Sequence, residues 1–245
     1  CRVRSWWVDR GGRMGNWHRG ARGLVLFPMD RADVLILGGG LVGSALGVAL
    51  DAHGLSSVIV DIADPEVILA AQFDGRCSAI ASAPQRMLDA IGVGARLSGH
   101  GCPIEGIRVS DGLEPGKLDF APSDGDSALG VMYENRQLRI ALMAAADAAP
   151  RADLRMKTRA VAVERGPNGV VATLSTGEQV RADLLVAAEG RASPTRDAAR
   201  IPVARWQYDH AAMIASIHHA ESHENIAYEI FYAQGPFAIL PLADD

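Results

Sequence analysis

Residues 33–43 read Asp-Val-Leu-Ile-Leu-Gly-Gly-Gly-Leu-Val-Gly, and this stretch decides the fold class. Its apolar run, residues 34–37, predicts a buried parallel strand. The run leads directly into the pattern Gly-x-Gly-x-x-Gly, and residues 44–50 then favour a helix because they are mostly small or apolar. A strand, a glycine turn and a helix in this order predict a cradle for the phosphates of a dinucleotide.

Each glycine of the pattern has a physical role. Gly38 allows the tight turn, Gly40 lets the backbone come close to a pyrophosphate, and Gly43 lets the helix pack close to the strand. The helix N-terminus adds free N–H groups and a partial positive charge. We therefore name these three glycines as cofactor-binding residues.

An acidic residue supports the same interpretation. A second apolar run, Ser57-Val-Ile-Val, ends at Asp61, which lies 18 residues after Gly43. This is close to the spacing of the acid that hydrogen-bonds a ribose hydroxyl in dinucleotide-binding units. The alternative is a glycine-rich turn with an ordinary strand-end Asp. We favour a nucleotide-binding βαβ unit because strand, spacing, helix and acid agree, and this unit alone leaves NAD and FAD both open.

Composition narrows the class of protein. The 245 residues are 49% hydrophobic and carry a net charge of −5, which argues against nucleic acid as a main partner. No apolar run is long enough to span a bilayer. The three cysteines show no metal or redox spacing and suggest reduced thiols in a cytoplasmic setting. We expect enough chain for one large domain or two smaller ones.

Residues 1–28 differ from the rest of the chain. They hold three of the four tryptophans, six arginines and one acid, and the chain begins with Cys1, whereas Met29 lies four residues before Asp33. We interpret residues 1–28 as a non-native or disordered extension. The rival interpretation is an Arg-rich, acid-poor targeting peptide.

The remaining chain alternates between strand and helix patterns. Residues 84–91 and 136–149 favour helices, and residues 99–130 favour loops with short strands. A hairpin is predicted over 161–174, followed by a buried strand over 182–188 that ends at Glu189-Gly190-Arg191. Residues 208–245 alternate in places and indicate sheet with one covered face.

Four stretches together carry a resemblance to a known family. They are Gly38–Gly43 with Asp61; Asp74-Gly-Arg76 with Ala79 and Ala81; Glu134-Asn-Arg-x-Leu-Arg139; and Asp183-Leu-Leu-Val-Ala-Ala-Glu-Gly-Arg-x-Ser-x-x-Arg196. From Asp33 to Asp245 the chain resembles the FAD-dependent aromatic hydroxylases, and within them the ubiquinone-biosynthesis hydroxylases. The resemblance implies an α/β fold: a Rossmann-like FAD-binding domain, as in p-hydroxybenzoate hydroxylase, with a β-sheet substrate domain, incomplete at the C-terminus.

The resemblance also implies roles for further residues. Arg76 would lie near the FAD phosphates or the active-site mouth, and Asn135 or Arg136 would contact the flavin or its ribityl chain. Asn135 is also a candidate helix N-cap. Glu189-Gly190 matches a motif usually read Asp-Gly, and the resemblance implies that both residues bind the cofactor. Glycine lets the strand end approach the cofactor pyrophosphate and, in the family, the nicotinamide nucleotide, whereas the added methylene of Glu leaves the position of its carboxylate open. The family's later Gly-Asp motif has no match before Asp245.

The implied activity is hydroxylation of an aromatic ring with FAD, NAD(P)H and O2. The implied substrate is a small aromatic molecule, namely a polyprenylated phenol of ubiquinone biosynthesis. No catalytic side chain is named, because the cofactor carries the chemistry. The alternatives are another FAD-dependent reaction (reductase, oxidase or halogenase), an NAD-binding dehydrogenase, and an inactive fragment. We expect a cytoplasmic protein; peripheral association with the inner membrane or a biosynthetic complex stays open, and so does the oligomeric state.

The expected domain boundaries follow from the same resemblance. Residues 29–105 and 131–200 would form the FAD-binding domain, and residues 106–130 and 201–245 part of the substrate domain. We expect no metal site. The late histidines, His219 and His223 among them, lie in a region of strand and turn character, where a spacing of four residues does not align two ligands.

Overall fold

The computed structural model describes residues 7–8, 14–15, 29–70, 75–114 and 116–243. The chain divides into two compact units, Cys1–Ile68 with Met143–Ala204 and Leu69–Leu142 with Arg205–Asp245. Most of the predicted extension 1–28 lies outside the described residues, apart from the paired strands β1 (Trp7–Val8) and β2 (Met14–Gly15). Asp74 of the Asp-Gly-Arg stretch also lies outside them.

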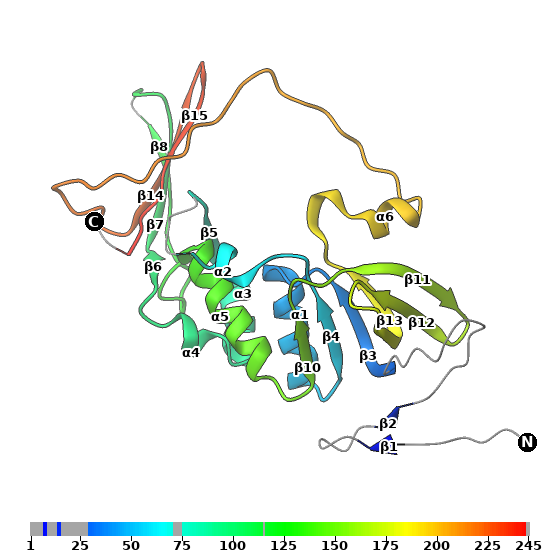
Figure 1. Cartoon of the computed structure of the whole chain (residues 1–245). Coiled ribbons are helices and arrows are strands. Elements are labelled where there is room, and N and C mark those ends of the chain that lie inside the picture. The colour runs from blue at the N-terminus through cyan, green and yellow to red at the C-terminus, as the bar shows by residue number, and fades with distance from the viewer. Residues whose placement is uncertain (1–6, 9–13, 16–28, 71–74, 115, 244–245) are drawn as a thin grey trace, which may run out of the picture. The chain divides into compact units, whose positions relative to one another are not determined.

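The first unit is built on a six-stranded sheet in the order β10-β4-β3-β13-β12-β11. Its strands are β3 (Met29–Leu37), β4 (Ser57–Val60), β10 (Ala152–Arg155), β11 (Ala160–Gly166), β12 (Gly169–Leu174) and β13 (Gln179–Ala187). The four neighbouring strands β10, β4, β3 and β13 pair in parallel. Strands β12 and β11 continue the sheet beyond β13 in antiparallel pairing (Figure 1). The predicted strands over 34–37 and 57–60 and the hairpin over 161–174 are confirmed.

The core of this unit lies on the apolar strands β3 and β4. Alternate side chains of a strand face opposite sides of the sheet. Leu35 and Val58 share a cluster with Val170 and Leu174 of the hairpin strands. Helix α1 (Leu41–Ala52) packs against β3, β4 and β10. The unit also contains α2 (Pro65–Ile68), the short 3-10 helix η1 (Gly190–Ala192) and α6 (Pro194–Ala198).

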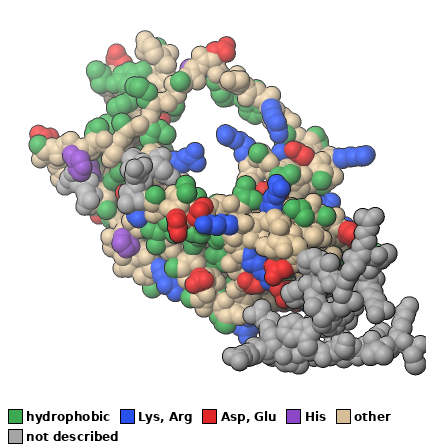
Figure 2. All heavy atoms as spheres, in the orientation of Figure 1, with side chains coloured by type: hydrophobic (Ala, Val, Ile, Leu, Met, Phe, Trp, Pro, Cys, Tyr) green, Lys and Arg blue, Asp and Glu red, His purple; other side chains and the backbone are tan. Residues whose placement is uncertain are grey.

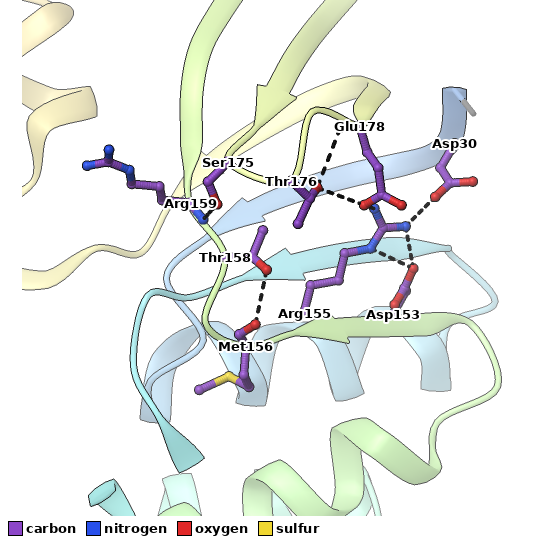
Figure 3. Close-up of polar contacts among 9 residues, drawn as sticks. All are labelled: Asp30, Asp153, Arg155, Met156, Thr158, Arg159, Ser175, Thr176 and Glu178. Carbon is purple, nitrogen blue, oxygen red and sulfur yellow. Dashed lines mark hydrogen bonds and ion pairs between the residues drawn. The ribbon is translucent and has the colours of Figure 1, made fainter. Parts of the chain in front are cut away.

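An ion-pair network ties the edge strand β10 to other parts of the same unit (Figure 3). The guanidinium of Arg155 contacts the carboxylates of Asp30, Asp153 and Glu178, at 2.6 Å for Asp153 and 3.5 Å for Glu178. Its side chain is only 15% exposed. Burial alone would lower the pKa of Arg155, but hydrogen bonds to Asp153 and Asp30 raise it overall. The network therefore anchors β10, whose short and polar sequence has little strand character of its own.

The second unit holds two smaller sheets. One is three-stranded in the order β5-β9-β6, and the other is four-stranded in the order β15-β14-β7-β8. The strands are β5 (Cys77–Ala81), β6 (Gly101–Ile104), β7 (Gly106–Asp111), β8 (Lys117–Phe120), β9 (Gly130–Glu134), β14 (Ile226–Tyr232) and β15 (Gly235–Ile239). Helices α3 (Ser82–Ala90) and α4 (Gly94–Leu97) complete it, and α5 (Asn135–Ala148) runs from this unit into the first.

The predicted sheet character of residues 208–245 is confirmed only in part. Strands β14 and β15 form, whereas residues 201–222 are extended and largely exposed without strand pairing. The alternating run over 226–232 forms β14, whereas residues 208–222 pair with no described strand. The assignment of the predicted segments to cofactor and substrate domains stays a prediction.

Candidate functional site: a glycine turn and its anchors

The glycine turn follows β3 directly and needs Gly38 for two reasons. Its φ is +103°, a backbone conformation that side chains with a Cβ rarely adopt. A Cβ placed on Gly38 would lie 2.3 Å from the carbonyl oxygen of Ala188, the residue that follows β13. The Gly38 N–H also donates to Val60 O at 2.8 Å, and the Ala188 N–H donates to Leu37 O at 2.6 Å, so the start of the turn is hydrogen-bonded on the sides of both β4 and β13.

Gly43 and Gly40 differ in what surrounds them. A Cβ on Gly43 would lie 1.8 Å from the carbonyl oxygen of Gly38, so only glycine lets α1 approach the turn this closely. A Cβ on Gly40 would meet no described atom within 4 Å, and Gly40 is exposed. The turn is thus closed on the side of Gly43 and open on the side of Gly40, which fits the approach of a ligand at Gly40.

The N-terminus of α1 is electrostatically suited to an anion. Gly40 is its N-cap and offers no side-chain hydrogen bond, and the first turn contains no acidic residue. The first N–H groups of a helix lack intrahelical acceptors and carry a partial positive charge. The first turn itself holds no acidic side chain to occupy these N–H groups, so they suit the phosphates of a dinucleotide.

Asp61 lies just after β4, and its carboxylate accepts hydrogen bonds from two backbone N–H groups. Its Oδ2 accepts the N–H of Gly39 at 2.7 Å, and its Oδ1 accepts the N–H of Ala63 at 2.7 Å. A carboxylate has about four acceptor positions, so Asp61 keeps capacity for a ribose hydroxyl. The motif spacing identified Asp61, but its contact with the glycine turn was not predicted.

A second carboxylate nearby is held in its charged form. Lys157 Nζ lies 2.7 Å from Asp64 Oδ2. The hydrogen bond from Lys157 lowers the pKa of the Asp64 carboxyl. Asp64, like Asp61, belongs to the loop that follows β4, and Lys157 lies just after β10.

Glu189 and Gly190 follow the end of β13, as predicted. Gly190 has φ +77° and begins η1. The Glu189 carboxylate accepts hydrogen bonds from the Ser193 hydroxyl and, at 3.1 Å, from the N–H of Thr195. Ser193 in turn caps α6 by accepting the N–H of Arg196 at 3.1 Å. The extra methylene of Glu therefore serves a contact with the first turn of α6.

The three remaining predicted residues lie in the second unit. Arg76 is exposed, and its carbonyl accepts the N–H of Asn135 at 2.9 Å. The side-chain oxygen of Asn135 accepts the hydroxyl proton of Ser78 at 2.6 Å. The Arg136 Nε donates to the carbonyls of Leu69 and Ala70, at 3.1 and 2.8 Å. The start of α5 is thus joined to β5 and to the chain before it.

The structure therefore brings the predicted residues together in two groups. Gly38, Gly40, Gly43 and Asp61 form one constellation at the carboxyl ends of β3 and β4, and Glu189 follows the neighbouring strand β13. Arg76, Asn135 and Arg136 form the other, around the start of α5. Sequence reasoning missed Gly39 and Ser44, whose role depends on tertiary contacts.

The described part of the chain contains neither a metal-binding cluster nor a membrane-spanning helix. No group of three or more His, Cys, Asp or Glu side chains there could hold a metal ion. The ring centroids of His219 and His223 lie 6.1 Å apart, and the rings meet edge to face. None of the helices among the described residues has both the length and the apolar character needed to cross a membrane.

The glycine turn, the strand-end acid and the parallel sheet define a dinucleotide-binding protein, and comparison with known families identifies the dinucleotide. The family described as "FAD binding domain" matches residues 31–244. Since this match covers most of the chain, the chain belongs to that family. The residues present fit the group: an open approach at Gly40, a first turn of α1 without acidic side chains, and a carboxylate at the end of β4.

Two curated relatives show the branch of the family to which the chain is similar. It is 47% identical over 223 residues to the ubiquinone hydroxylase UbiL of Rhodospirillum rubrum, covering 91% of this chain and 52% of the relative. It is 32% identical over 220 residues to the 3-demethoxyubiquinol 3-hydroxylase of Escherichia coli, covering 87% of this chain and 55% of that enzyme. The chain thus spans about half the length of these relatives.

Solved structures share the fold. PqsL, a probable FAD-dependent monooxygenase from Pseudomonas aeruginosa, is 25% identical with a TM-score of 0.62, over 73% of this chain and 48% of that one. The Diels-Alderase PyrE3 of pyrroindomycin biosynthesis is 27% identical with a TM-score of 0.57, over 71% and 35%. The predicted fold, a Rossmann-like FAD-binding α/β structure, is confirmed.

Proposed function

We propose that the protein is an FAD-dependent monooxygenase that hydroxylates an aromatic ring with NAD(P)H and O2. The observation that carries the proposal is the glycine turn with Asp61, in a chain 47% identical to a ubiquinone hydroxylase. A second relative acts, by its name, on demethoxyubiquinol. The proposed substrate is accordingly a polyprenylated phenol on the way to ubiquinone.

The first unit would hold the adenosine and pyrophosphate half of FAD. Gly38 shapes the turn, Gly40 leaves room for the pyrophosphate, and Gly43 brings α1 close enough to donate its N–H groups. Asp61 would accept a ribose hydroxyl with its remaining acceptor positions. Glu189 and Gly190 would lie at the cofactor pyrophosphate, and Glu189 also fixes the chain after β13 through Ser193 and Thr195.

The roles that we propose for the remaining predicted residues come from the resemblance to the family. We propose that Arg76 lies near the FAD phosphates or the active-site mouth, and that Asn135 or Arg136 contacts the flavin or its ribityl chain. The four-stranded sheet supports the role of residues 106–130 and 201–245 in substrate binding. Tyr228 pairs with Ile239 and Ile230 with Phe237, so alternation puts these side chains on one face. Figure 2 shows hydrophobic side chains gathered over this part of the molecule.

FAD, when bound, supplies the redox and oxygen chemistry of the reaction. The residues described here bind and orient the cofactor, and none needs to act as an acid, a base or a nucleophile. The second candidate function is another FAD-dependent reaction: a reductase, oxidase or halogenase reaction. It is favoured by the occurrence of the same fold in a Diels-Alderase, because a fold does not select one reaction.

The proposal is tested on the natural protein, purified with its cofactor. It is supplied with NADH or NADPH, O2 and a polyprenylated phenol. We expect the phenol to accelerate NAD(P)H consumption and to gain one oxygen atom, which comes from labelled O2. NAD(P)H consumption without oxygen incorporation would favour a reductase or oxidase, and a protein without flavin would contradict the proposal.

We further propose a cytoplasmic protein that meets its substrate at the inner membrane, alone or within a biosynthetic complex. The support is chemical: a long prenyl tail partitions into a bilayer. Flotation with vesicles, with and without a prenylated phenol, tests the membrane contact. Recovery in the soluble fraction under both conditions would contradict it.

A further inference from the structure

Ser44 is a buried polar residue that the glycine motif does not require. It lies in the first turn of α1 and is only 1% exposed. Its hydroxyl donates to the carbonyl oxygen of Gly39 at 2.8 Å. Its own N–H donates to Gly40 O at 3.0 Å, as a helical residue should. The side chain of Ser44 therefore holds the glycine turn from within the helix.

The other polar group of Gly39 is also held by a side chain. The Gly39 N–H donates to Asp61 Oδ2 at 2.7 Å. Gly39 is buried, and a Cβ placed on it would lie 3.1 Å from the Cβ of Asp61. Both backbone groups of Gly39 are thus fixed, one from α1 and one from the loop after β4.

This anchoring determines where the next amide points. No peptide bond among the described residues is cis, and in a trans peptide the C=O and the following N–H point in opposite directions. Because the Gly39 carbonyl points to buried Ser44, the N–H of Gly40 points away from it. Gly40 is exposed, and a Cβ on it would meet nothing within 4 Å. The Gly40 amide is therefore presented to the open side of the turn.

Three consecutive glycines would otherwise leave this peptide free to rotate, because glycine has the widest range of backbone conformations. We propose that Ser44 is a positioning residue for FAD. Its hydroxyl, acting with Asp61, holds the Gly39–Gly40 peptide in the orientation that binds the pyrophosphate. The proposal rests on the proposed FAD-binding function and assigns to it a side chain outside the glycine motif.

The experiment compares Ser44→Ala with Ser57→Ala in the whole chain. Ser57 is a matched control because it lies on β4, is 2% exposed, and its hydroxyl has no hydrogen-bond partner among the described residues. The probes are FAD, ADP and adenosine, titrated by calorimetry. We expect Ser44→Ala to weaken FAD and ADP about three- to tenfold, the range for one net hydrogen bond, and to leave adenosine unchanged. Ser57→Ala should leave all three affinities unchanged.

Ser44→Cys is the second variant, because it keeps the size of the side chain with a weaker donor. We expect its affinity for ADP to lie between those of the wild type and Ser44→Ala, and it serves alone if the alanine variant does not fold. Equal ADP affinity in the wild type and the Ser44 variants would overturn the proposal. An equal loss for adenosine and ADP would also overturn it, since that indicates general loosening. A wild-type chain that binds neither FAD nor ADP would contradict FAD binding itself.

Discussion

Gly43→Ala is the substitution whose effect the structure determines most closely. The new Cβ would lie 1.8 Å from Gly38 O, about 1.6 Å short of ordinary contact at 3.4 Å. Helix α1 would have to move away from the turn, and overpacking of this kind costs about 1–3 kcal/mol or more. The higher helix propensity of Ala returns at most about 1 kcal/mol. We expect a net loss of about 2 kcal/mol, a large fraction of the stability of a typical domain.

Gly40→Ala is the matched control, since its Cβ enters open space and its φ of −68° and ψ of −165° suit any residue. Its free energy of unfolding should fall by less than about 1 kcal/mol, because loss of a capping side chain to Ala typically costs about 1 kcal/mol and Gly already forgoes a few tenths of that. Its FAD affinity should fall, because the methyl group would occupy the side from which the pyrophosphate approaches. Urea unfolding and FAD titration measure the two effects. Equal stability of the two variants, or unchanged FAD affinity of Gly40→Ala, would refute this reasoning.

Three further predictions concern residues around the site. Arg155→Met should lower the free energy of unfolding, measured in urea, by about 1–3 kcal/mol, because it leaves three carboxylates without their shared cation. The loss is smaller than for a fully buried ion pair because the three carboxylates are partly exposed. Hydrogen bonds from Ser56 lower the pKa of Asp33 below 3.8, so its stabilising effect is present above that pH and is lost as the pH falls through the lowered value. Asp33→Asn should therefore flatten the acid limb of a stability-against-pH curve. Glu189→Asp should lose the contact with the Thr195 N–H and speed amide hydrogen exchange in α6.

Each of these predictions has an outcome that contradicts it. An Arg155→Met variant with wild-type stability would show that the network contributes nothing net. If the stability of Asp33→Asn fell as steeply at low pH as that of the wild type, the hydrogen bonds from Ser56 to Asp33 would not be a cause of the acid sensitivity. Unchanged exchange in α6 of Glu189→Asp would mean that the shorter carboxylate still reaches Thr195.

The βαβ unit could be predicted from sequence because its signals are local. Apolar runs over 34–37 and 57–60 are long enough to mark buried strands, and glycine spacing marks the turn between strand and helix. Strand β10 could not be predicted in this way. Its four residues include Asp153 and Arg155. It forms because it pairs with β4 and because Arg155 is also paired with Asp30 and Glu178 from distant parts of the chain.

The site was predictable in its positions but not in its contacts. Asp61 was identified by spacing, yet its hydrogen bond to Gly39 exists only once β4 lies beside β3. In the sequence, nothing distinguishes Ser44 from the other small residues of the predicted helix. Its significance appears only in the folded chain, where its hydroxyl meets the Gly39 carbonyl.

The central claim is that this chain carries the adenosine and pyrophosphate cradle of an FAD-dependent enzyme. Calorimetric titration of FAD into the purified chain, repeated with ADP already bound, tests it most directly. The account predicts one FAD per chain and loss of that binding in saturating ADP, because both ligands share the cradle at Gly38–Gly43. No binding of FAD, or FAD binding that ADP does not displace, would contradict it.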